Sequence, residues 1–177
     1  MRHAGSTNNL MGDARMLKGR DVIHLPLVHP ASGQTLGRVA DLIVDPEQGR
    51  VTELLIDAQA EGGTSRISWS QVQVDQDVIR TEAQPEAASQ DTAEKGLCIS
   101  RFAGCPVMTQ GGRSIGQVGD LLIDPSQGHV TGVEVTDGLM QDLLTGRIQL
   151  PWPDVLRWSP ETIVVAEHWQ DAWQRSL

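Results

Sequence analysis

The sequence predicts a mainly β protein made of two small antiparallel β-barrels in tandem, followed by a short C-terminal helix. Three observations predict this fold class. The stretch at residues 36–52 recurs at residues 115–131 with ten of seventeen positions identical, where unrelated segments would share about one. Aliphatic and β-branched residues stand on both sides of a break in each copy, as in two strands of a half-buried sheet. The break itself has turn chemistry in both copies, Asp-Pro-Glu-Gln-Gly and Asp-Pro-Ser-Gln-Gly.

Each copy of the repeated stretch therefore predicts a β-hairpin. The proline presets φ at the first central turn position, the preceding aspartate can accept a bond from a following backbone N–H, and the last glycine accommodates a positive φ. Another glycine lies just inside the first strand, where it permits a bulge or sharp bend at a barrel corner. The motif residues are Gly37, Asp41, Asp45, Pro46 and Gly49 in the first copy, and Gly116, Asp120, Asp124, Pro125 and Gly128 in the second.

The rest of the chain divides into segments by composition. Its start is polar and unpatterned, as in a mobile tail, and a stretch between the two copies is acidic without large apolar residues, as in a linker. The predicted divisions are a disordered tail at residues 1–16, a first barrel at 17–81, an acidic linker at 82–95, a second barrel at 96–168 and a C-terminal helical segment at 169–177.

Further strands complete each predicted barrel. The first barrel is expected to have strands at residues 22–28, in the hairpin at 34–57, and at 66–69 and 78–79. Ser70 is expected to cap a single helical turn before the last of these. The second barrel is expected to have strands at residues 97–108, in its hairpin, and at 148–152 and 163–165. Trp69 and Trp152 match each other, so we expect both to pack in a core or between the barrels.

Charge and composition restrict the function classes. The formal net charge is −9 without a visible Lys/Arg cluster, so direct nucleic-acid binding is not expected. No apolar run approaches the roughly 20 residues of a membrane span, and the start of the chain lacks the apolar core of a signal peptide. We therefore expect a cytoplasmic protein, in which Cys98 and Cys105 are reduced thiols.

No catalytic or metal-binding pattern stands out. Asp41 and Asp45, like Asp120 and Asp124, are four residues apart, which places two carboxylates about 13 Å apart along a strand, too far to share one cation. The histidines lack ligand spacing and the serines lack a nucleophile-elbow context. We expect no catalytic residue, no metal ion and no cofactor.

The second half carries apolar residues that the first half lacks, and these predict an interaction surface. They lie in a longer loop and in the tail, at Leu139, Met140, Leu143, Leu144, Trp169 and Trp173. Because duplicated domains need equivalent cores, unmatched apolar residues are expected to form a contact between the barrels, with a second copy or with a partner. The alternative is that the tail helix packs under this loop within one chain.

The pattern Gly-x₃-Gly-x-Val-x-Asp-x₃-Asp-Pro-x₂-Gly-x-Val-Thr, beginning at Gly33 and again at Gly112, resembles the PRC-barrel family. That resemblance implies a small, mostly antiparallel β-barrel of the kind found in the photosynthetic reaction centre H subunit and in a ribosome maturation factor. It also implies an interaction module without shared catalytic residues. The expected function is a non-catalytic adaptor that binds a protein partner or forms a homodimer. Two alternatives are an RNA-associated or ribosome-associated factor and a small-molecule or metal-binding regulator.

Overall fold

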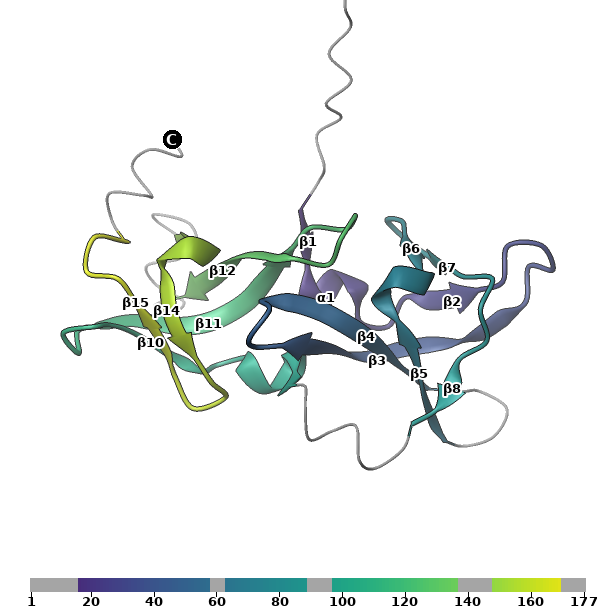
Figure 1. Cartoon of the computed structure of the whole chain (residues 1–177), viewed down its shortest axis with the longest axis horizontal. Helices are drawn as coiled ribbons and strands as arrows, with labels where there is room; N and C mark the ends of the chain where they lie inside the picture. Colours follow the sequence, from purple (N-terminus) through teal and green to yellow (C-terminus); the bar gives the residue numbers. More distant parts are fainter. Residues whose placement is uncertain (1–15, 58–62, 89–96, 137–147, 170–177) are drawn as a thin grey trace, which may run out of the picture.

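The described part of the chain forms two β-sheets that lie side by side along the long axis of the molecule (Figure 1). The computed structural model describes residues 16–57, 63–88, 97–136 and 148–169. Each sheet is built on one copy of the repeated hairpin, so the prediction of a mainly β protein is confirmed. We call residues 17–87 the first repeat and residues 97–169 the second repeat.

The first sheet has the strand order β6-β7-β2-β3-β4-β5-β8. Its strands are β2 (Pro26–Val28), β3 (Thr35–Asp45), β4 (Arg50–Asp57), β5 (Thr64–Ser68), β6 (Gln73–Val74), β7 (Ile79–Arg80) and β8 (Glu86–Ala87). The second sheet has the order β13-β12-β11-β10-β15-β14. Its strands are β10 (Pro106–Thr109), β11 (Ser114–Ile123), β12 (Val130–Thr136), β13 (Ile148–Pro151), β14 (Val155–Trp158) and β15 (Ile163–Val165).

The two hairpins show the same irregularity in register. Val39 pairs with Ile56, but the next pair joins Asp41 to Leu55, so one residue of β3 is left over as a bulge. In β11 the corresponding step runs from Val118 to Asp120. A bulge bends its strand and redirects the following side chain. The bulge therefore sets the direction of the motif aspartate in both repeats.

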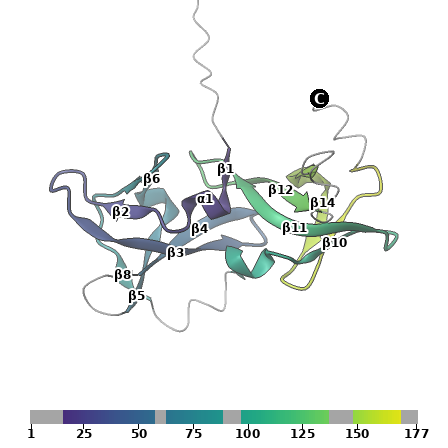
Figure 2. The same cartoon turned by 180° about the vertical axis from the view of Figure 1, so that it is seen from behind.

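The first segment of each repeat leaves its own sheet and pairs with the other. Strand β1 (Leu17–Lys18) is antiparallel to β11 of the second sheet, and β9 (Leu97–Cys98) is antiparallel to β3 of the first sheet. A short helix follows each of them, α1 (Gly19–Val22) and a 3₁₀ helix at Ile99–Phe102. Figure 1 and the reverse view in Figure 2 both show β1 and α1 at the junction of the two sheets.

One continuous apolar core joins the two repeats. Its fully buried members come from both hairpins and from the strands beside them. They include Leu27, Leu42, Leu54, Ile56, Ile79, Phe102, Leu121, Ile123, Leu150 and Ile163. Repeats of about seventy residues bury a smaller fraction of their surface alone than larger domains do, so the shared core stabilises both.

The structure corrects four predictions of secondary structure. The strand expected at residues 97–108 is split into the crossing segment β9, a 3₁₀ turn and the shorter strand β10. The strand expected at residues 22–28 is reduced to β2, because Val22 ends helix α1. The expected linker at residues 82–95 contains β8, which pairs with β5. Ser68, and not Ser70, caps the 3₁₀ turn, through a capping box with Gln71.

The expected closed antiparallel barrels also differ from the structure. Among the described residues, each sheet is an open path of paired strands with two ends. Each sheet contains one parallel pair, β2 with β7 and β10 with β15. The closing strands β7 and β15 each follow a 3₁₀ turn, at Trp69–Gln71 and Trp152–Asp154. The expected helical segment at residues 169–177 lies outside the described residues beyond Trp169.

Candidate functional site

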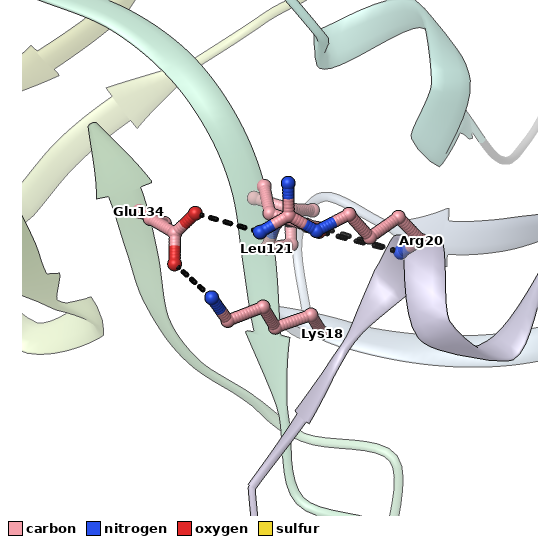
Figure 3. Close-up of polar contacts among 5 residues, drawn as sticks. Lys18, Arg20, Leu121 and Glu134 are labelled. Atoms are coloured by element: carbon pink, nitrogen blue, oxygen red, sulfur yellow. Dashed lines mark hydrogen bonds and ion pairs between the residues drawn. The ribbon is translucent and has the colours of Figure 1, made fainter. Parts of the chain in front are cut away.

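A cluster of four charged side chains ties the first repeat to the second sheet. The Arg20 guanidinium lies 3.1 Å from Asp120 Oδ2 through Nε and 3.1 Å from Glu134 Oε1 through Nη2. Lys18 pairs with the other oxygen of Glu134. Figure 3 shows both cations extending from β1 and α1 to strands β11 and β12. The cluster therefore joins residues about a hundred positions apart in the chain.

The two carboxylates of this cluster are neighbours in a buried part of the second sheet. Asp120 and Glu134 are cross-strand partners, and their side chains are 5% and 2% exposed. Burial raises the pKa of Asp120, although the backbone N–H groups of Leu121 and Arg20 favour its charged form. Two adjacent buried carboxylates are costly without compensating cations. The arrangement is suited to hold the cationic segment of the first repeat.

The first sheet has an equivalent contact in which a serine takes the place of the cation. Asp41 accepts hydrogen bonds from the backbone N–H of Ser100, at 3.3 Å, and from the Ser100 hydroxyl. It also accepts one from its neighbour Leu42 at 2.8 Å. Its cross-strand partner is Leu55, where the second sheet has Glu134. The ionic cluster is thus present in one of two otherwise equivalent contacts.

The hairpin turns of the two repeats also pair with each other. The Val51 N–H donates to the Gly128 carbonyl and the Val130 N–H donates to the Gly49 carbonyl, each at 2.8 Å. Between them, Arg50 forms an isolated antiparallel bridge with His129. Each turn therefore forms backbone hydrogen bonds to the other repeat, and we call this contact the turn seam.

Tryptophans cover the turn seam from both sides. A Cβ on Gly49 would lie 2.6 Å from Trp152 Nε1, and a Cβ on Gly128 would lie 2.9 Å from Trp69 Nε1. Each indole therefore packs on a glycine of the opposite repeat, as the matching positions of these tryptophans predict. Trp158 stands edge-on to Trp152, with ring centroids 4.6 Å apart. It donates from Nε1 to the Pro46 carbonyl of the first repeat at 2.9 Å.

The remaining motif aspartates lie within their own turns. Asp45 accepts hydrogen bonds from the backbone N–H groups of Glu47 and Gln48, and Asp124 accepts one from the backbone of Ser126. Pro46 and Pro125 occupy the expected turn positions. Within the described residues, no three His, Cys, Asp or Glu side chains gather in a way that could hold a metal ion.

The strand glycines of the motif lie close to the neighbouring strand, and both cysteines are free thiols. Gly37 and Gly116 lie in β3 and β11, where an added Cβ would meet a carbonyl oxygen of the neighbouring strand, that of Asp57 or Thr136. Cys98 and Cys105 are free, and they lie on two different elements. Burial raises the pKa of both thiols; nearby acidic groups, Asp41 for Cys98, raise it further.

The predicted interaction surface is only partly described. Leu139, Met140, Leu143, Leu144 and Trp173 lie outside the described residues. Trp169 is 6% exposed and belongs to the common core. The chain after β15 turns back and buries this indole within the chain, while its expected role in a contact with a partner stays a prediction.

Sequence reasoning missed a different apolar surface on the second sheet. Leu156 is 55% exposed and is the extra residue of a bulge in β14. With Met108 and Val164 it borders an open depression of about 260 Å³. Ile79 and Ile163 occupy equivalent positions in the closing strands of the two repeats. The residue after them is Arg80 in the first repeat and Val164 in the second. An alignment of the closing strands would have revealed this difference.

The fold and its contacts define a tandem β repeat whose two units exchange their first segments. A comparison with known families matches the PRC-barrel domain at residues 15–87 and again at residues 95–167. The chain belongs to the PRC-barrel domain family, with two tandem copies as predicted. A comparison with curated proteins finds no match. Within the described residues, no helix is both long and apolar enough to span a bilayer.

Proposed function

We propose that this chain is a non-catalytic adaptor of the cytoplasm that binds a protein partner along β14 of the second repeat. The observation that carries the proposal is the apolar surface formed by the exposed Leu156 and the half-buried Met108 and Val164 beside that strand. We call these three residues the β14 surface. Exposed apolar groups that line a depression are typical of protein contacts.

The position of β14 supports this mode of binding. It ends the strand order of the second sheet, so one side of its backbone is open to pairing among the described residues. Extended peptides add to such edges through backbone hydrogen bonds, while pockets beside the edge accept alternate side chains. The depression next to Leu156 supplies such a pocket, and the neighbouring Arg157 favours an acidic residue in the partner.

The buried charges support an adaptor in another way. Lys18, Arg20, Asp120 and Glu134 are engaged in the contact between the repeats. They hold the two sheets in one arrangement, which presents the β14 surface on a rigid support. A rigid surface loses less conformational entropy when a partner binds.

Photo-crosslinking tests the proposal. A photo-reactive amino acid at position 156 is expected to capture a specific protein, while the same group at the exposed position 73 on β6 serves as the matched control. Affinity for the purified partner is then measured for Leu156→Ser and Val164→Arg. The second variant introduces the residue that the first repeat carries at the equivalent position, Arg80.

Each variant is expected to weaken binding at least about tenfold, with Gln73→Ser unchanged. Equal capture at positions 73 and 156, predominant capture of RNA, or full affinity in both variants would contradict the proposal.

A further inference from the structure

The contact between the two repeats has the features of an interface between separate molecules. Strand β1 pairs with the second sheet and β9 pairs with the first, so each repeat supplies a strand to the other. In an exchanged arrangement of this kind, the same contacts form whether the two units belong to one chain or to two. The side chains at the contact determine which pairs of repeats form a stable complex.

Most of the contact is reciprocal and would suit any pair of repeats. In the turn seam, the hydrogen bonds from Val51 to Gly128 and from Val130 to Gly49 are equivalent with the repeats interchanged. The packing of Trp69 and Trp152 on the opposite glycines is equivalent as well. These contacts supply affinity, but they do not distinguish the first repeat from the second.

The charged cluster supplies the distinction. Glu134 and Asp120 of the second repeat face Lys18 and Arg20 of the first. By the register of β1 and β9, the second repeat carries Cys98 and Ser100 where the first carries these two cations. Pairing two second repeats would therefore leave two buried carboxylates facing uncharged side chains. Burying a carboxylate without a compensating cation is strongly unfavourable.

The loss of ion pairs also disfavours the pairing of two first repeats. Arg20 would then face Asp41 and Leu55, and the Glu134 contacts of both cations would be lost. Charge thus favours the mixed pair over either like pair, in the way that charged positions select partners in coiled coils.

We infer that the repeats recognise each other without a covalent connection, and that the partner accepted by each is the complementary repeat of a second copy of this chain. The first repeat of one copy then pairs with the second repeat of another. The described contacts that carry this recognition all lie in residues 17–69 and 97–158. The inference is independent of the proposed adaptor function.

Cleavage of the folded protein tests the inference. A protease site inserted within residues 89–96 of the full chain is cut after folding, and the product is examined by native mass spectrometry. The two fragments are expected to stay together as one mixed pair at micromolar concentration. Mixing cleaved protein in heavy-isotope and light-isotope forms is expected to give mixed-isotope pairs. Separation or aggregation of the fragments after cleavage, or a lack of isotope exchange over days, would overturn the inference.

Two substitutions in the cleavable chain test the specificity. Glu134→Leu introduces the residue of the first repeat, Leu55, and is expected to allow pairs of two second repeats to appear. Gly128→Ala places a methyl group against Trp69 and is expected to weaken the mixed pair at least about tenfold. Gly112→Ala is its control, since that glycine also has a positive φ but has nothing within 4 Å of an added Cβ. Absence of like pairs in the first variant, or equal weakening by both glycine variants, would contradict charge-selected recognition.

Discussion

Asp41 and Asp120 occupy equivalent positions after the bulges of β3 and β11, and each accepts a backbone hydrogen bond from the first segment of the opposite repeat. The donors are Ser100 N–H at 3.3 Å for Asp41 and Arg20 N–H at 3.4 Å for Asp120. Each aspartate also accepts from the N–H of the next residue in its strand. A motif residue within one repeat therefore orients a segment of the other.

Removing the Arg20 side chain is expected to destabilise the protein. Arg20→Ala takes a cation from two buried carboxylates, and breaking such a cluster is costlier than its net attraction. Because Arg20 is 46% exposed, solvent screening reduces the effect, and we expect a loss of about 1–2 kcal/mol in the free energy of unfolding. Urea denaturation measures it. Asp21→Ala, on the exposed side of α1, is the control; an equal loss in both would exclude the cluster as the cause.

The stability contribution of Asp120 is expected to fall as pH rises. Burial raises the pKa of Asp120 in the folded state above its ordinary value of 3.8, so between these two values the folded state binds more protons than the unfolded chain. The contribution is fully present below pH 3.8 and is lost as pH rises through the folded-state pKa. Arg20 and Glu134 are the charged groups beside it.

Unfolding free energies of the natural protein and of Asp120→Asn, measured between pH 4 and 8, check this prediction. The difference between the two proteins is expected to shift in favour of Asn as pH rises. A shift in the opposite direction would mean that the contact with Arg20 outweighs burial.

A methyl group at Gly37 is expected to be poorly tolerated. Its Cβ would lie 2.5 Å from the Ile56 side chain and 2.6 Å from the Asp57 carbonyl oxygen, so the paired strands β3 and β4 would have to separate. Gly37→Ala should cost about 1–3 kcal/mol, measured by thermal unfolding. Gly33→Ala has open space around the added Cβ; its destabilisation reports backbone strain alone and is expected to be smaller.

The two thiols are expected to react slowly in the native protein. Burial raises the pKa of Cys98 and of Cys105, which lowers the fraction of reactive thiolate at neutral pH. Alkylation by iodoacetamide at pH 7.5, followed by mass spectrometry, should be at least about tenfold slower than in denatured protein. Native and denatured rates that agree would show that neither thiol is protected.

The local chemistry of the sequence determined the two hairpins and their turns. Alternating aliphatic residues specify which face of a strand is buried, and the Asp-Pro-x-x-Gly break specifies where the chain reverses. Both signals act between residues close in sequence, so the ranges of β3, β4, β11 and β12 could be predicted. The duplication also predicted the equivalence of Trp69 and Trp152, whose indoles pack on Gly128 and Gly49.

Only the tertiary structure decided how the repeats are joined. Leu17 of β1 and Leu97 of β9 have apolar side chains that suit either sheet, and nothing local indicates that each strand pairs with the opposite repeat. Arg20 and Asp120 are a hundred residues apart, and periodicity within a segment carries no information about contacts at that separation. The burial of Trp169 and the exposure of Leu156 depend on the same long-range arrangement, because a side chain is buried by whatever the folded chain brings against it.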